Sequence, residues 1–177
     1  HRIIIDPVNP DVVYAGAIGN PWAPHTERGF YRSTDGGQNW KRLLFTNETS
    51  GVADMVMDPS NPGKIFVAMW DHQRWPWFFR SSAEGSGLWL TRNGGETFER
   101  VRGGLPEETG RIGLAIARSD PDYVYAYVES KPSAIYRSTD GGVSWEKRGE
   151  KNIGSRPFYY AEIYVDPQNE NRVYTLY

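Results

Sequence analysis

The chain has 177 residues, of which 38% are hydrophobic and 14% aromatic, enough for one domain with a sizeable core. Lys and Arg total 20 against 22 Asp and Glu, a net charge of −2, and no basic run is present, which argues against a nucleic-acid partner. The absence of cysteine excludes disulfides, thiolate metal sites and cysteine nucleophiles. No segment of the sequence approaches the roughly twenty apolar residues of a membrane span.

Short runs rich in Val, Ile and Tyr recur along the chain and predict β-strands. Residues 2–5, 12–17, 65–70 and 124–128 are examples. No long segment repeats its apolar residues with the 3.6-residue period of a helix. We therefore expect an all-β protein with almost no helix.

A strand, a Pro-containing turn and a second strand occur four times, at residues 5–14, 57–66, 117–125 and 165–174. The turn reads Asp-Pro-x-Asn-Pro in the first two copies and is altered in the last two. Proline and Asn favour turns and interrupt strand pairing. We call these two strands A and B.

A second motif, Ser-x-Asp-x-Gly-x-x-Trp, follows the first three A–B pairs, at residues 33–40, 91–98 and 138–145. Its glycines accept positive φ, its Asp or Asn accepts hydrogen bonds from turn amides, and its aromatic residue begins the return strand and buries apolar surface against a neighbour. These roles are structural rather than catalytic. The residues concerned are Ser33, Asp35, Gly37, Trp40, Thr91, Asn93, Gly95, Phe98, Ser138, Asp140, Gly142 and Trp145.

The repeating unit is therefore strand A, Pro turn, strand B, variable loop, strand C, Asp-Gly-Gly turn and strand D. Its period of about fifty residues suits a four-stranded propeller blade. We predict a segment of a β-propeller with about three and a half antiparallel blades. The blades are expected at residues 1–45, 52–102 and 110–149, with half a blade at 158–177.

The Ser-x-Asp-x-Gly-x-x-Trp motif resembles the Asp-box, or BNR repeat, of sialidases, sortilin-type Vps10 domains and xyloglucanase-type propellers. Together with the Asp-Pro-x-Asn-Pro turns, it most resembles large bacterial sortilin-like "glycosyl hydrolase BNR repeat" proteins. The resemblance covers essentially the whole chain and implies the propeller fold. It leaves the activity open, because propellers of this kind have many functions.

Four A–B pairs but only three C–D hairpins are present, whereas propellers close with four to eight blades. An open row of blades leaves strand edges and an apolar face uncovered. We expect the remaining blades to belong to the same longer chain. The alternative is that two or more copies of this chain complete a ring.

The Pro turns and the Asp-Gly-Gly turns are predicted to share one face of the blades, and the B–C loops and D–A links the other. The second face has the irregular sequence, so a functional site is expected there. Its longest B–C loop, at residues 70–87, combines aromatic and charged side chains that suit a sugar ring, a peptide or a partner protein. We predict ligand binding by Trp22, Trp70, His72, Arg74, Trp75, Trp77, Phe78, Arg80, Arg111 and Arg156.

Structural alternatives accompany these assignments. The aromatic residues of the loop would equally form a small core of their own, and the arginines would form surface or inter-blade ion pairs. Two histidines, His25 and His72, are too scattered to define a metal site with Asp71 or Glu27, and no cofactor is indicated.

Glycoside hydrolysis needs two carboxylates across the scissile bond. The candidates on the irregular face are Glu27, Asp71, Glu84, Glu107, Glu108 and Glu162, and no pair stands out from the local sequence. We therefore predict a non-catalytic module that binds carbohydrate or peptide, in a secreted, periplasmic or cell-surface protein. A fragment of a sialidase-like or xyloglucanase-like glycoside hydrolase is the alternative, and a purely structural segment is a third possibility.

Overall fold

The computed structural model describes residues 2–154 and 161–176. Its first four-stranded sheet has the order β1-β2-β3-β4, and the second has the order β5-β6-β9-β10. The strands of the first sheet are β1 (Arg2–Ile5), β2 (Val13–Ala17), β3 (Gly29–Ser33) and β4 (Lys41–Leu44). Those of the second are β5 (Ser50–Asp58), β6 (Asn61–Asp71), β9 (Gly87–Thr91) and β10 (Glu99–Val101).

A third four-stranded sheet, in the order β11-β12-β13-β14, is followed by a pair of strands, β15-β16. A further pair, β7-β8, lies between β6 and β9 in the chain. These strands are β11 (Ile112–Ile116), β12 (Val124–Val128), β13 (Ala134–Ser138), β14 (Glu146–Gly149), β15 (Glu162–Asp166), β16 (Asn169–Leu176), β7 (Gln73–Arg74) and β8 (Phe79–Arg80).

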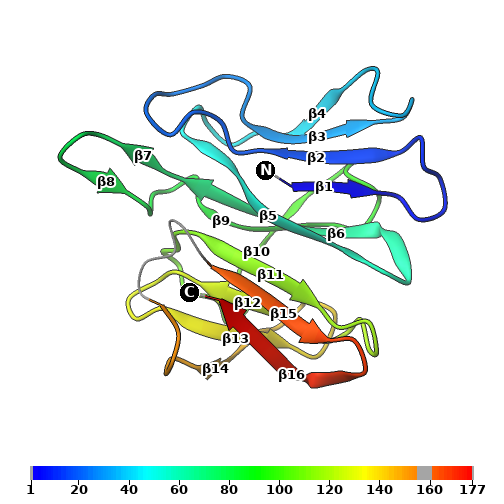
Figure 1. Cartoon of the computed structure of the whole chain (residues 1–177), viewed down its shortest axis with the longest axis vertical. Coiled ribbons are helices and arrows are strands. Elements are labelled where there is room, and N and C mark those ends of the chain that lie inside the picture. Colours follow the sequence, from blue (N-terminus) through cyan, green and yellow to red (C-terminus); the bar gives the residue numbers. More distant parts are fainter. Residues whose placement is uncertain (1, 155–160, 177) are drawn as a thin grey trace.

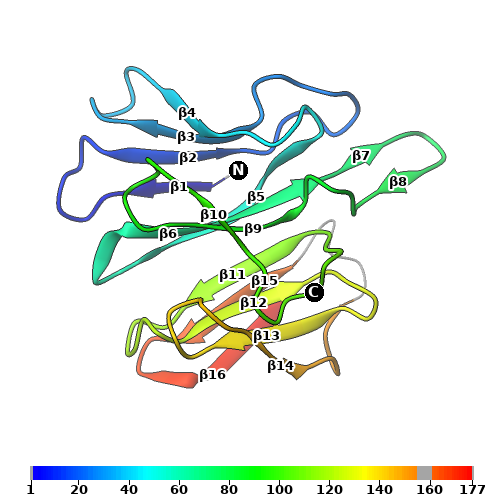
Figure 2. The ribbon, with the colours of Figure 1, turned by 180° about the vertical axis from the view of Figure 1, so that it is seen from behind.

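All strand pairs are antiparallel, and no helix occurs in the described residues. The sheets stand side by side, with the β7-β8 ribbon projecting beyond them (Figures 1 and 2). The first strand of each sheet contacts the first strand of the next, β1 with β5, β5 with β11 and β11 with β15. This arrangement confirms the all-β fold of successive propeller blades. No helical segment with the length and hydropathy needed to cross a bilayer is found in the part of the chain described here.

The Asp-box turns are closed by hydrogen bonds within a few residues. In the third box, the Ser138 hydroxyl donates to Asp140 Oδ1 over 2.6 Å, and the Gly142 amide donates to Ser138 Oγ over 2.8 Å. The altered middle box keeps this arrangement, because the Thr91 hydroxyl donates to Asn93 Oδ1 over 3.0 Å. Gly142 has a φ of 94°, a conformation that glycine adopts readily.

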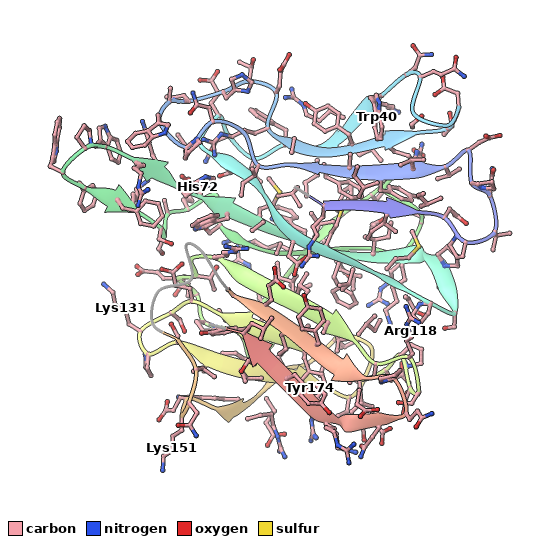
Figure 3. All side chains as sticks on the ribbon, in the orientation of Figure 1. Trp40, His72, Arg118, Lys131, Lys151 and Tyr174 are labelled. Atoms are coloured by element: carbon pink, nitrogen blue, oxygen red, sulfur yellow. The ribbon has the colours of Figure 1, made fainter. Side chains whose placement is uncertain are left out.

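Each Asp-box turn also binds the Pro turn of its own sheet. The amides of Gly36, Gly94 and Gly141 donate to the carbonyls of Asp11, Gly63 and Asp122, at 2.9, 2.9 and 3.0 Å. The two kinds of turn therefore lie at one end of the sheets. The B–C loops and D–A links lie at the other end, as Lys131 and Lys151 opposite Arg118 illustrate (Figure 3).

The apolar core lies between neighbouring sheets rather than within one of them. The aromatic residue of an Asp-box packs on the preceding sheet: Phe98 lies edge-on to Phe30 at 5.8 Å, and Trp145 to Phe66 at 6.3 Å. Trp40 differs from the expectation that each box buries its aromatic residue, since it is 43% exposed. The described residues place no sheet in front of the first one, so Trp40 has no surface to cover.

Candidate functional site

The β7-β8 ribbon extends beyond the end of the second sheet (Figure 1). At its tip, the Trp75 amide donates to the Phe78 carbonyl over 2.7 Å, which closes a tight turn. Trp77, in this turn, is 83% exposed, and Phe78 is also exposed. Trp22, from the first B–C loop, is a third exposed aromatic side chain.

A hydrogen bond between backbone groups joins the first B–C loop to the β7-β8 ribbon. The Arg74 amide donates to the Pro21 carbonyl over 2.7 Å. The Arg74 guanidinium lies 5.8 Å from the centre of the Trp22 ring and 5.7 Å from that of Phe79. Arg74, Trp22 and the ribbon therefore form one continuous part of the loop face.

The base of the ribbon is buried. The rings of Trp70 and His72 stack at 4.0 Å, and Phe79 meets Trp70 edge-on at 6.0 Å. Arg111, from the link before the third sheet, lies 5.6 Å from the Trp70 ring centre. Trp70, His72 and Arg111, which we predicted to bind ligand, are thus buried, with Trp70 in contact with the other two. Trp70 and Phe79 correspond to the small aromatic core given above as the structural alternative.

Asp71 ties the ribbon to the link between the first two sheets. Its carboxylate accepts hydrogen bonds from the Thr49 hydroxyl at 2.7 Å and the Asn47 amide at 3.1 Å, and pairs with Arg80 at 2.8 Å. Burial by itself would raise the pKa of Asp71, but these hydrogen bonds and the Arg80 charge hold the pKa below its ordinary value. Asp71 is therefore an ionised structural anchor in this site.

Arg28, at 0% exposure, joins three segments of the loop face. Its guanidinium donates to the carbonyl of Thr49 over 2.7 Å and to that of Asn20 over 2.5 Å. Nη1 also lies 3.4 Å from Nδ1 of His72. Burial lowers the pKa of Arg28, but an arginine still remains charged. One buried cation thus fixes the first B–C loop, the first D–A link and the ribbon.

This buried cation also acts on His72, which Figure 3 places at the base of the ribbon. Burial lowers the pKa of His72 to about 4, and the charges of Arg28 and Arg111 add to the effect. The Trp70 carbonyl, 3.2 Å from Nδ1, and the Asp71 charge act in the opposite direction. His72 is therefore neutral at pH 7.

The carboxylates predicted as weak catalytic candidates differ in how far they are buried. Asp71 is buried and bonded as described above, whereas Glu27 and Glu84 are exposed. Glu84 lines a cavity of about 630 Å³ between the second and third sheets, together with Arg100 and Glu108. Arg156 lies outside the described residues. In the described part of the chain, no three His, Asp or Glu side chains gather in a way that could hold a metal ion.

Sequence reasoning missed two carboxylates that join the sheets, Asp54, which is buried, and Glu129, which is half-buried. Glu129 Oε2 accepts the Ser81 hydroxyl at 2.5 Å and the Arg111 amide at 2.8 Å, which joins the ribbon to the third sheet. Asp54 binds Arg2 at 2.8 Å and the Leu114 amide at 2.9 Å, which links the first strands of three sheets. Neither carboxylate belongs to a repeated motif, so the sequence contains no local signal for them.

Sequence comparisons place the chain among larger propeller proteins. The profile of the Sortilin-Vps10 family, described as sortilin, neurotensin receptor 3, matches residues 28–176. A xyloglucanase of Acetivibrio thermocellus is 26% identical over 178 residues, which cover 81% of this chain and 19% of the relative. A xyloglucanase of a Paenibacillus species is 28% identical over 162 residues, covering 79% of this chain and 15% of the relative. The chain thus spans about a fifth or less of the length of the curated relatives it matches.

Solved structures give the same fold. The GH74 xyloglucanase of Xanthomonas campestris superposes with a TM-score of 0.69 at 17% identity, over 97% of this chain and 26% of the other. An ancestral GH74 enzyme gives 0.68 at 19% identity, over 94% of this chain and 20% of the other. At these identities the likeness establishes the fold alone.

Proposed function

We propose that this chain, which belongs to the Sortilin-Vps10 family, supplies a carbohydrate-binding face of a larger β-propeller protein. The observation that supports this function is the exposed aromatic group at the loop end, formed by Trp22, Trp77 and Phe78 beside Arg74. The ribbon that presents Trp77 and Phe78 has a buried base, which hydrogen bonds and an ion pair of Asp71 hold in place. The xyloglucanase names of the curated relatives favour a glucan over a peptide as the ligand.

Exposed aromatic rings suit a sugar chain for a physical reason. The C–H faces of a pyranose are apolar and pack on an aromatic ring, while its hydroxyls bond to polar groups at the edge. Arg74 supplies hydrogen-bond donors beside the Trp22 ring. Because the ribbon is fixed at its base, the protein itself loses little conformational entropy when a chain of sugars binds at the tip of the ribbon.

Binding without cleavage fits the carboxylates of the loop face. Hydrolysis requires two carboxyl groups about 5–10 Å apart that both reach the substrate. Asp71 is committed to Thr49, Asn47 and Arg80. Glu27 and Glu84 come from different B–C loops, the one before β3 and the one after β8. The proposal includes a location outside the cytoplasm, where the protein would encounter polysaccharides.

Binding is measured by calorimetric titration of the chain with xyloglucan oligosaccharides. We expect Trp77→Ala to weaken binding at least about tenfold, as loss of an aromatic anchor does at other interfaces. Trp40→Ala is the matched control, since it removes an exposed tryptophan from the opposite end of the sheets. Affinity that is unchanged in both Trp77→Ala and Trp22→Ala, or binding of peptides in preference to glucans, would contradict the proposal.

The second candidate is a hydrolase of which this chain forms one side, which the names of the relatives favour. It is tested by release of reducing ends from xyloglucan. Turnover that disappears in Glu27→Gln or Asp71→Asn, with folding retained, would establish this alternative and remove the non-catalytic assignment.

A further inference from the structure

Arg28 is fully buried, and one of its two terminal nitrogens holds the part of the first B–C loop that carries Trp22. Nη2 donates to the Asn20 carbonyl over 2.5 Å and lies 3.4 Å from the Ala23 carbonyl. These two residues lie on either side of the exposed Trp22 in the chain. The Trp22 amide in turn donates to Asn20 Oδ1 over 2.9 Å. The backbone on both sides of Trp22 is therefore fixed to one buried cation.

The other terminal nitrogen of Arg28 contacts the base of the β7-β8 ribbon. Nη1 donates to the Thr49 carbonyl over 2.7 Å and lies 3.4 Å from Nδ1 of His72, the residue immediately before β7. A second connection follows further along the ribbon, where the Arg74 amide donates to the Pro21 carbonyl. The first B–C loop and the ribbon are therefore joined by one guanidinium and one hydrogen bond between backbone groups.

An arginine suits this position because its guanidinium is a rigid, planar fork. Its two terminal nitrogens donate to different segments at once, whereas the ammonium of a lysine is a point charge on a flexible stem. The backbone also passes close to this side chain. Gly19 has a φ of 77°, and a Cβ there would lie 2.4 Å from Cγ of Arg28. Arg28 is thus placed to hold two segments of the loop face at a fixed spacing.

We propose that Arg28 is a positioning residue that fixes Trp22 relative to the ribbon, so that Trp22 and Trp77 bind one extended ligand together. This inference rests on the proposed carbohydrate function and narrows the ligand to an oligosaccharide long enough to contact both aromatic side chains. When two binding surfaces are held at a fixed spacing, contact with the first gives the ligand a high effective concentration at the second. That gain is lost when the spacing varies, even where each surface stays intact.

Calorimetric titration with xyloglucan oligosaccharides of increasing backbone length tests this assignment. In the wild type, we expect affinity to rise about tenfold or more once the oligosaccharide is long enough to contact both tryptophans. Arg28→Met keeps a long apolar side chain but removes the hydrogen-bond donors. This variant should lose the rise in affinity with length, while its affinity for the shortest oligosaccharide that binds is unchanged.

A double-mutant cycle separates positioning from a general loss of structure. Trp22→Ala should weaken binding of the long oligosaccharide about tenfold when Arg28 is present. It should have little further effect in Arg28→Met, because Trp22 no longer lies at the required spacing. A purely structural role of Arg28 would lower Tm and leave the effect of Trp22→Ala the same. Arg28→Lys, which keeps the charge but not the fork, should fall between wild type and Arg28→Met.

Two results would overturn the assignment of Arg28. One is an equal effect of Trp22→Ala with and without Arg28, and the other is a loss of affinity in Arg28→Met that is the same for every ligand length. If Arg28→Met does not fold, the same comparisons are made with Arg28→Lys. A wild-type chain that binds none of these oligosaccharides contradicts the proposed function itself, and the inference is then wrong with it.

Discussion

Replacement of His72 by phenylalanine tests whether the buried histidine makes the fold sensitive to acid. The ring stacks on Trp70 at 4.0 Å, and burial lowers its pKa from an ordinary 6.5 to about 4. Between these pH values the unfolded chain binds a proton that the folded chain does not. Stability from this site is therefore complete above pH 6.5 and is lost as the pH falls toward 4. His72→Phe keeps a planar ring and removes the proton.

The size of the effect follows from the pKa difference. At about 1.36 kcal/mol for each pH unit, the fall from pH 6.5 to 4 costs about 3 kcal/mol of unfolding free energy. In a domain of this size that corresponds to roughly 6–12 °C in Tm. Asp54 and Glu129, whose pKa values are raised mainly by burial, titrate in both proteins. The difference between wild type and His72→Phe therefore isolates the histidine.

The assay is urea unfolding followed by tryptophan fluorescence at a series of pH values from 7 to 4. We expect the wild-type free energy of unfolding to fall toward acid more steeply than that of His72→Phe, with the two curves converging in slope above pH 6.5. The control His25→Gln removes an exposed histidine and should behave as wild type. Equal slopes for wild type and His72→Phe, or a flattened slope in His25→Gln, would refute the reasoning.

Two further substitutions test the packing between sheets and the Asp-box turn. Gly113→Ala would place a Cβ 2.0 Å from the Ala161 carbonyl oxygen, so we expect a loss of about 1–3 kcal/mol in urea unfolding. Gly149→Ala, which meets nothing within 4 Å, should be nearly neutral, and equal losses in both would discount the close approach. In thermal unfolding, Asp140→Asn should be tolerated, since Asn93 makes the corresponding bonds in the middle box, whereas Asp140→Ala should lower Tm. Equal Tm values for Asn and Ala at this position would show that the side-chain acceptor is dispensable.

The turns could be predicted from the sequence because their bonds are local. Ser138 binds Asp140 two residues away, and Gly142 binds Ser138 four residues away. Hydrogen bonds from the Asn39 amide and side chain, with one from Ser33, likewise hold the pKa of Asp35 at about 2. Each partner lies inside the motif, so reading the motif was enough to place the strands and identify the fold.

The base of the loop site could not be predicted in the same way, because its partners are distant in sequence. Asp71 binds Thr49 across 22 residues, and Ser81 binds Glu129 across 48. Aromatic composition showed that residues 70–80 were unusual but not which rings face solvent. That division depends on the neighbouring sheets, which cover Trp70 and leave Trp77 exposed.

The three Asp-boxes show that burial follows from neighbours rather than from the motif. Trp40 and Trp145 have the same local sequence position and the same turn, yet only Trp145 has a preceding sheet to cover. The same rule separates Trp70 from Trp77 at the other end of the molecule. Trp40 and Trp77 are both exposed but lie at opposite ends of the sheets. Trp77 therefore tests ligand binding at the loop end, and Trp40 is its control at the Asp-box end.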